Sequence, residues 1–439
     1  QGKALAELGL RLVLETEDAS LVLLWAERLK AGALDLPPVR PPQDEALALA
    51  MADVRNLEAQ LREETAAGTA DAELRERLQN RRQTVSQTLR GVSGQASSDS
   101  ILGPDELNNL LAVASDRFVV EFLVSGGLLW SVSVMSLESQ LHCLGPVTPV
   151  ERELDNLLFA IRRAARGPVS EASADAVRKS IERSVAFLDE FLFAGVEVPP
   201  GTEAVVVPTG RLHELPWGAL PSLRGRAPVV TPSLRLWCRA PRGSSPSANE
   251  LLLMAAPGLD SAEAEIAEVA AIYAVSADPP VVLVHLGPAA TPTRALELLE
   301  RVDVAHIAAH GSFRDESPMF SSIHLDGGSL TVHDLETMAS APRLVLLPAC
   351  SAGRSGTHFG DELLGTTGAL LSIGVESLIA PDIEVPDDAT RHCMAALHQK
   401  LAAGLAPNVA LDEMVSEVIQ DSDLRRVSAG LAFVCFGTL

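Results

Sequence analysis

The second half of the chain alternates short apolar runs with segments of helical spacing, and this alternation constrains the fold more than any other feature. The apolar runs predict strands at 251–256, 281–285, 302–309, 343–349, 375–380 and 430–436, and the segments between them predict helices at 261–274, 291–301, 361–373, 387–404 and 408–420. Strands that alternate with helices form a mostly parallel sheet covered on both faces. We therefore expect a three-layer α/β/α module over residues 249–439.

A second α/β module is expected earlier in the chain, over residues 104–240. Phe118–Val124 and Leu128–Met135 are apolar and β-branched, and the Ser-Gly-Gly between them is a hairpin signal. Two helices and a central strand follow, at 150–166, 174–193 and 204–208. A cluster of Pro, Gly and Ser from Arg239 to Asn249 marks the boundary between the two modules.

The N-terminal part of the chain has helical spacing. Residues 4–34 predict a two-helix hairpin, which would be the last unit (1–36) of a helical repeat array, because such repeats need neighbours to cover their apolar faces. Residues 44–92 predict a helical arm or short coiled coil, and two helices packed on the body are the alternative. The chain begins at Gln1 within a helical pattern, which indicates a fragment of something longer.

Composition indicates a globular protein with several domains. The chain has 439 residues, of which 47% are hydrophobic, and a formal net charge of −23. A surface this acidic repels a phosphate backbone, so we expect no nucleic-acid partner. No apolar run of roughly 18 residues and no leader peptide occurs, so we expect no membrane partner. The cysteines lack close spacing and indicate free thiols in the reducing cytoplasm: Cys143, Cys238, Cys350, Cys393 and Cys435.

Two of the predicted strands end in residues that can carry chemistry. The apolar run Val304–Ala309 stops at His310 and Gly311, and the run Leu344–Leu347 stops shortly before Cys350. Ligands bind outside the carboxyl ends of strands in open α/β sheets, so His310 and Cys350 are expected to share one crevice. A histidine can generate the reactive thiolate of a cysteine. The backbone N–H groups of Gly311 and Cys350 could form an oxyanion hole. A buried structural cysteine is the alternative.

The other histidines predict no metal site. His306 and His310 have the i, i+4 spacing of a helical metal pair, but they lie in a strand pattern and lack the Glu of the zincin motif, so His306 is expected to be a core histidine. The polar contexts of the remaining candidates predict surface positions for His324, His333, His358, His392 and His398. No phosphate-binding glycine motif occurs, and we expect no cofactor.

Several motifs occur in an order that resembles a known family. They are Val304–Phe313, Leu330-Thr331 with Asp334-Leu335, Leu347–Gly353, Gly360–Gly365 and Val385–Thr390, preceded by Val207–Leu220 and Ala262–Ile266. This series is similar to the CHAT domain, a caspase-like family typically attached to tetratricopeptide repeats, and the resemblance extends over roughly residues 105 to 439.

The resemblance implies a cysteine endopeptidase of the clan that includes caspases and separase. His310 would be the general base or acid, Cys350 the nucleophile, and Gly311 an oxyanion donor. Residues 104–240 would be an inactive caspase-like module, residues 249–439 the catalytic one, and the N-terminal helices the end of a tetratricopeptide array.

The substrate pocket departs from the family pattern at one position. Where the family usually has Ser-Leu-Trp-Pro-Val, this chain has Pro-Asp-Ile-Glu-Val, so Ile383 replaces the Trp that tends to wall the cleft. Separase-like relatives place an acid about where Asp387 falls and prefer a basic residue before the cleaved bond. The resemblance therefore implies a basic P1 residue read by Asp387, with Asp388 or Asp361 as substitutes. The alternative is that Asp387 caps the helix that follows.

The sequence thus predicts a cytoplasmic cysteine endopeptidase that cleaves a dedicated protein partner. The helical N-terminal region would receive a partner or ligand that regulates it, and proteases of this resemblance act in bacterial signalling and defence. The alternative is a catalytically silent caspase-like scaffold for protein assembly.

Overall fold

The computed structural model describes most of the chain. The described residues are 2–34, 53–54, 57, 60–61, 73–81, 84, 102–167, 170–239, 249–259, 261–312, 322–348, 367, 370–371, 373–383 and 387–437. Cys350, Asp361 and most of the helix predicted at 361–373 lie outside these ranges. Of the arm predicted at 44–92, the described residues are helical, and Arg81 pairs with Asp53 at 2.5 Å.

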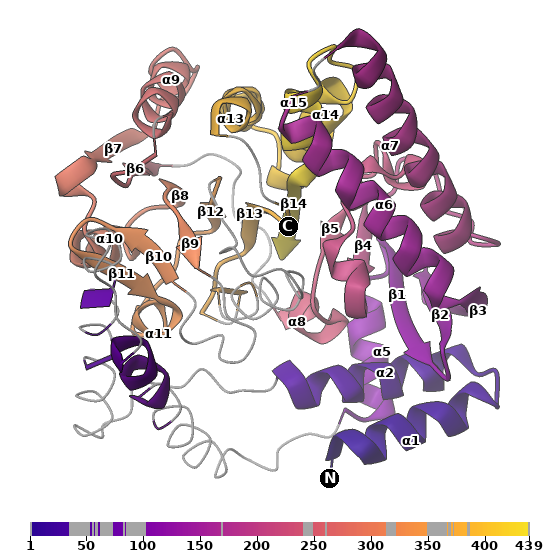
Figure 1. The fold of residues 1–439 in the computed structure, drawn as a ribbon. Coiled ribbons are helices and arrows are strands. Elements are labelled where there is room, and N and C mark those ends of the chain that lie inside the picture. The colour runs from indigo at the N-terminus through magenta and orange to yellow at the C-terminus, as the bar shows by residue number, and fades with distance from the viewer. Residues whose placement is uncertain are drawn as a thin grey trace.

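One eleven-stranded sheet runs through both predicted modules (Figure 1). Its order is β3 (Glu138–Pro146), β2 (Leu128–Met135), β1 (Phe118–Ser125), β4 (Ala204–Val207), β5 (Val229–Val230), β14 (Phe433–Gly437), β13 (Ser377–Pro381), β12 (Leu344–Leu346), β8 (Val304–Ala308), β6 (Glu250–Ala255) and β7 (Val281–Leu286). Neighbouring strands are parallel except for β3/β2, β2/β1 and β14/β13. The mostly parallel sheet predicted from the sequence is confirmed.

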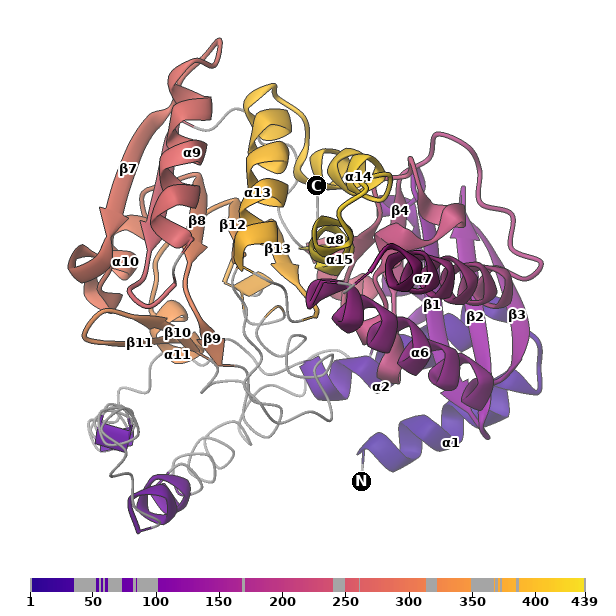
Figure 2. The same cartoon turned by 45° about the horizontal axis from the view of Figure 1, so that its top comes forward.

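Helices cover both faces of the sheet (Figure 2). On one face a row of helices is in contact from end to end: α9 (Ala262–Ala274), α13 (Asp387–Ala402), α15 (Leu424–Ala432) with α14 (Pro407–Val418), α6 (Val147–Ala165) and α7 (Glu171–Leu192). Successive residues of β8 face opposite sides of the sheet: His306 contacts Glu265 of α9, while Ile307 lines a small cavity together with Leu299 of α10 (Pro292–Leu299). The helices α9 and α10 therefore cover opposite faces, as right-handed crossovers require.

Smaller elements complete the fold. A second, three-stranded sheet has the order β11 (Gly328–Thr331), β10 (Ser322–Leu325) and β9 (Gly311–Ser312), followed by α11 (Val332–Leu335). The helices α5 (Pro104–Val113) and α8 (Leu234–Arg239) are in contact, and the turns η1 (Gly210–Glu214), η2 (Trp217–Ala219), η3 (Pro221–Leu223) and η4 (Gly287–Ala289) connect larger elements. The elements β3, α5 and α15 were not expected from the sequence.

The C-terminal strand joins the two modules. The strand β14 pairs with β13 of the second module over Phe433 to Gly437, and its Phe436 pairs with Val230 in β5 of the first module. The sequence predicted a strand from residue 430, but residues 424–432 form α15, so the prediction was wrong at its start. A short apolar run does not distinguish a buried helix from a buried strand, which explains the error.

The N-terminal hairpin docks on the first module through two buried acids. It consists of α1 (Gly2–Leu14) and α2 (Ala19–Leu34). The carboxylate of Glu27 accepts hydrogen bonds from the backbone N–H groups of Leu234 and Arg235, each at 2.9 Å, at the start of α8. Lys30 Nζ lies 2.8 Å from Oε1 of Glu121 on β1. Burial raises the pKa of Glu121 to about 8, although Lys30 opposes the shift. The predicted repeat array remains a prediction.

We predict that Glu27→Ala loosens the hairpin from the body. The substitution leaves two buried N–H groups without their acceptor, which costs about 1–3 kcal/mol for each group left unsatisfied. Hydrogen exchange in α2 should accelerate in Glu27→Ala. It should not change in Glu7→Ala, which alters an exposed side chain of the same hairpin. Equal exchange rates in both variants would contradict this account of docking.

Candidate functional site

The strands that lead to His310 and Cys350 are direct neighbours. They pair in parallel, with Leu344 opposite Val304 and Leu346 opposite His306. Both strands therefore end at the same edge of the sheet, where His310 follows β8 and Pro348 follows β12. The neighbouring strands expected from the sequence are observed. Cys350 lies two positions beyond Pro348 and outside the described residues, so the His310/Cys350 pair stays a prediction.

The backbone beside His310 is held by the small sheet. His310 is half-buried, and its carbonyl oxygen accepts a hydrogen bond from His324 N–H at 2.8 Å. The next residue, Gly311, is buried, begins β9 and pairs with Ile323 of β10. The chain therefore turns out of the large sheet immediately after His310. This turn fixes the backbone at which the predicted base and oxyanion donor lie.

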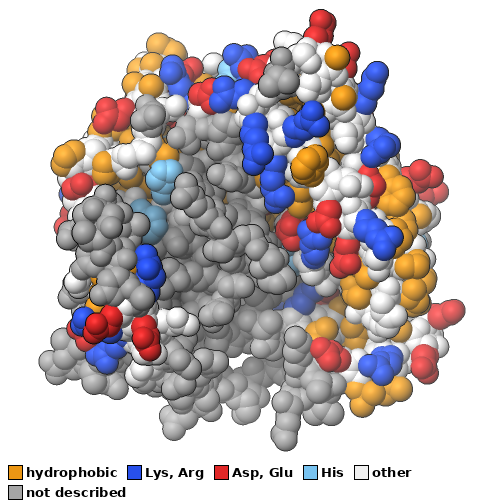
Figure 3. All heavy atoms as spheres, in the orientation of Figure 1, with side chains coloured by type: hydrophobic (Ala, Val, Ile, Leu, Met, Phe, Trp, Pro, Cys, Tyr) orange, Lys and Arg blue, Asp and Glu red, His pale blue; other side chains and the backbone are white. Residues whose placement is uncertain are grey.

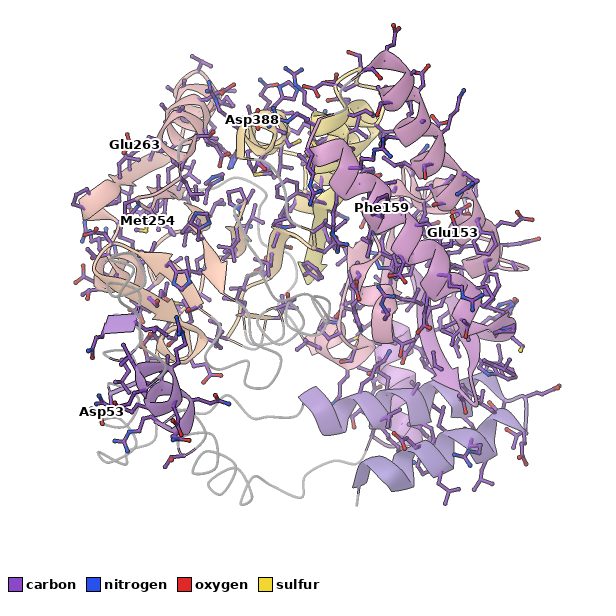
Figure 4. The ribbon with its side chains drawn as sticks, in the orientation of Figure 1. Asp53, Glu153, Phe159, Met254, Glu263 and Asp388 are labelled. Carbon is purple, nitrogen blue, oxygen red and sulfur yellow. The ribbon has the colours of Figure 1, made fainter. Side chains whose placement is uncertain are left out.

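Three of the predicted pocket residues, Ile383, Asp387 and Asp388, lie around the start of α13, and Asp361 lies outside the described residues. Asp387 is the first residue of α13, and Ile383 is buried just after β13. Asp388 is exposed and pairs with Arg425 of α15 at 2.6 Å (Figure 4). A substrate cation would have to compete with Arg425 for Asp388. The roles of Asp387, Asp388, Asp361 and Ile383 in substrate binding stay predictions.

Sequence reasoning missed a buried carboxyl group at the same edge of the sheet. Asp382 directly follows β13, the strand next to β12, and is 2% exposed. Neither of its carboxyl oxygens has a hydrogen-bond partner in the described part of the chain. Burial, reinforced by the charge of Glu214, raises its pKa well above the ordinary value. The rule that selected His310, a polar residue directly after an apolar strand, would also have selected Asp382.

A chain of buried polar side chains lies beneath this edge. His306 Nε2 is 2.9 Å from Glu265 Oε1 of α9, and His306 Nδ1 is 2.9 Å from His398 Nε2 of α13. His398 Nδ1 is 3.1 Å from the hydroxyl of Tyr273, also on α9. His306 is a core histidine, as expected. The surface position predicted for His398 was wrong, because a single histidine on a helix does not reveal its tertiary partner.

Two other thiols are poor candidates for a nucleophile. Burial raises the pKa of Cys393 and of Cys435 to about 12, and the charge of Glu265 adds to the shift at Cys393. Both thiols therefore stay protonated at neutral pH, and a protonated thiol is unreactive. Within the described ranges no group of His, Cys, Asp or Glu could hold a metal ion, and no helix is long and apolar enough to cross a membrane.

The family model of the CHAT domain matches residues 182–437, more than half of the chain. The chain belongs to the CHAT domain family. No curated protein matches it. The matched range begins within α7 and includes β8, β12, β13 and the start of α13, so it contains every residue assigned to the candidate site.

Solved structures of separase share the fold of this CHAT domain protein. Two structures of the Saccharomyces cerevisiae separase–securin complex align with TM-scores of 0.56 and 0.57, at 10% and 9% identity, over 75% and 96% of this chain. They show the fold alone, and a caspase-like α/β fold is confirmed. This chain covers 30% and 36% of those chains. The Arg specific cysteine proteinase gingipain R aligns at 12% identity over 65% of this chain and 75% of its own, with a TM-score of 0.37.

We predict that acid destabilises the CHAT domain fold through His398. Burial and the nearby His306 lower the pKa of His398 well below its ordinary value of 6.5. The His398 imidazole therefore takes up a proton more readily in the unfolded chain than in the folded one. The contribution of His398 to stability is complete above pH about 6.5 and falls below it, by up to about 1.4 kcal/mol per pH unit.

Urea denaturation between pH 7.5 and 5 checks this expectation. The loss of stability on acidification should be smaller in His398→Gln than in the unmodified chain. It should be unchanged in His392→Gln, which alters an exposed residue of the same helix. Burial also lowers the pKa of His213, to about 3, so part of the slope should persist in every variant. An unchanged slope in His398→Gln would exclude His398 as the cause.

Proposed function

We propose that this protein is a cysteine endopeptidase that cleaves a dedicated protein partner. The observation that supports the proposal is the parallel pairing of β8 with β12, because it brings His310 and Pro348, which precedes Cys350 by two positions, to one edge of the sheet. Membership of the CHAT domain family supports it. The fold shared with separase is consistent with it.

The proposed mechanism uses residues of this chain alone. His310 takes the proton of the Cys350 thiol, and the thiolate attacks the carbonyl carbon of the substrate. The N–H groups of Gly311 and Cys350 stabilise the oxyanion of the tetrahedral intermediate. His310 then donates its proton to the leaving amine, which leaves a thioester on Cys350. Water, deprotonated by His310, attacks the thioester carbonyl, the C–S bond breaks to release the acid, and His310 returns the proton to Cys350.

The proposed substrate has a basic residue before the cleaved bond. Asp387 is the first candidate to bind it, at the start of α13, and Asp388 and Asp361 are substitutes. Asp382 is a further candidate, because its buried carboxyl group lacks a hydrogen-bond partner among the described residues and follows the strand next to β12. A bound guanidinium or ammonium group would favour the ionised form of Asp382 and satisfy its oxygens.

Regulation is proposed to enter through the N-terminal helices. The hairpin contacts the body at the start of α8 and at β1, and β1 belongs to the same sheet as β8 and β12. A protein activator or ligand that displaces the hairpin would therefore act on the sheet that carries the site. A role in bacterial signalling or defence, in the cytoplasm, is part of the same proposal.

The second candidate function is a catalytically silent scaffold, and one surface of α6 favours it. Phe159 is 66% exposed on this helix, and Arg162, Arg163 and Arg166 are exposed beside it. Phe159 projects from α6 in Figure 4, and Lys and Arg side chains gather on this face in Figure 3. On a chain with a net charge of −23, this face would suit an acidic segment of a partner with an apolar anchor.

We predict that Cys350→Ala abolishes cleavage of the partner and that His310→Ala slows it by about 10²–10⁴-fold, the usual contribution of general acid–base catalysis. Proteins encoded beside this chain are the candidate substrates, and cleavage is followed by mass spectrometry. Cys143→Ala, which removes an exposed thiol on β3, is the matched control and should keep full activity. Cleavage that persists in Cys350→Ala would refute the endopeptidase. Stable binding without cleavage, lost in Phe159→Ala, would support the scaffold.

We also predict that a peptide library is cleaved after Lys or Arg. Asp387→Asn should lower kcat/KM for these peptides by about 10–100-fold, because a charge-assisted hydrogen bond is worth about 1.5–3 kcal/mol. Asp388→Asn should change it little, since Arg425 already engages that carboxylate. If the loss appears in Asp382→Asn or Asp361→Asn instead, the pocket belongs to that residue. Cleavage after Asp or after apolar residues would exclude a basic P1 pocket.

A further inference from the structure

The buried chain Glu265–His306–His398–Tyr273 connects three elements, two of which lead to or carry residues of the proposed site. His306 lies on β8, which leads to His310, and His398 lies on α13, which begins at Asp387. Glu265 and Tyr273 lie on α9, which packs against α13. All four side chains are at most 6% exposed. The distances of 2.9, 2.9 and 3.1 Å place each in hydrogen-bonding contact with the next.

The donors and acceptors of these four side chains determine which of their atoms carry the protons. An ionised Glu265 accepts only, so His306 Nε2 carries a proton, and in a neutral imidazole His306 Nδ1 is then the acceptor. His398 Nε2–H then donates to His306 Nδ1, and the Tyr273 hydroxyl donates to His398 Nδ1. Every bond in the chain is made in this order with both imidazoles neutral. A reversal of the two bonds made by His398 would require one additional proton, on Glu265 or on His306.

Glu265 lies in the first turn of α9, and His398 and Tyr273 complete the chain. Burial lowers the pKa of His398 and raises that of the Tyr273 hydroxyl, which keeps both of these groups neutral at neutral pH. With Glu265 as the terminal acceptor and both imidazoles neutral, all three hydrogen bonds point toward Glu265.

Glu265 also reaches the edge of the sheet. It lines a cavity of about 10 Å³ together with Ala308 at the end of β8, Pro348 after β12 and Thr390 in the first turn of α13. A cavity of this size holds at most about one water molecule. Glu265 thus contacts His306 and also lines the cavity that Ala308 and Pro348 line.

We propose that Glu265 is a positioning residue, and that the proton-ordered chain it terminates holds β8 and α13 in the relative position that the His310/Cys350 site requires. The inference rests on the proposed function for its catalytic meaning, but the placement of His310 can be measured without any activity. A shift of about 1 Å in a reacting group can lower the rate by on the order of 10²-fold. The buried hydrogen bonds between β8 and α13 can therefore affect the reaction rate although none of their side chains contacts the substrate.

Histidine NMR tests the proton order directly. Long-range ¹H–¹⁵N correlation spectra of the ¹⁵N-histidine-labelled chain report which ring nitrogen is protonated, and His306→Gln, His398→Gln and His310→Gln assign the signals. We expect protons on Nε2 of both His306 and His398. A proton on Nδ1 of His306 would overturn the proposed order.

Three variants test positioning. Glu265→Ala removes the acceptor, and it should shift the His310 signals and slow alkylation of Cys350 by iodoacetamide at least about tenfold. Glu265→Gln keeps an oxygen that can accept from His306, and it should restore most of the rate. Glu268→Ala is the matched control, because it breaks the exposed 2.7 Å ion pair with Arg391 between the same two helices. It should change neither measurement, since exposed ion pairs contribute little.

The outcomes separate this inference from the proposed function. If Glu265→Ala does not fold, Tyr273→Phe removes the terminal donor while keeping the ring packed, and it should shift His310 in the same direction. Unchanged His310 signals in folded variants whose His306 signals have moved would overturn positioning. If Cys350 does not react in the unmodified chain while His310 shifts as expected, the proposed protease fails and the positioning of His310 stands.

Discussion

The parallel pairing of β8 with β12 is the constraint on which the candidate site depends. In a parallel pair both strands run in the same direction, so the residues that follow them emerge at one edge of the sheet. The flanking strands β6 and β13 hold this pair in the middle of the second module. Because both faces are covered by helices, the edge is where polar groups can meet a substrate. His310, Pro348 and Asp382 all follow strands at this edge.

Buried polar groups tie the fold together at specific points. Glu27 joins the N-terminal hairpin to α8, and Glu265 begins the chain that joins α9, β8 and α13. Each carboxylate has donors placed by an element distant in sequence. A buried carboxylate is costly unless it is paired in this way, so these contacts specify one arrangement of elements. Asp382 differs, since its oxygens lack protein partners within the described ranges, and this makes it a candidate for contact with a ligand.

The continuous sheet changes how the two predicted modules relate. The boundary placed at residues 239–249 is a change in composition, but β14 pairs with β5 on one side and with β13 on the other. The main-chain hydrogen bonds of the sheet therefore run from β3 to β7. The hairpin contacts β1 and α8, and β1 belongs to the same sheet as β8 and β12. The proposed regulation would act through these contacts.

The sequence by itself determined most of the element types, the mostly parallel sheet and the strand ends before His310 and before Cys350. Apolar periodicity and the turn residues that bound it are local signals, so they can be read without a structure. Only the tertiary structure decided that β14 joins the modules, that α15 precedes it, and that His398 is buried against His306. Those facts depend on contacts between residues far apart in the chain, and apolar periodicity carries no information about such contacts. Asp382 belongs partly to each group. The sequence predicted the end of the strand that precedes it, but the packing of the tertiary structure decided that its carboxyl group is buried.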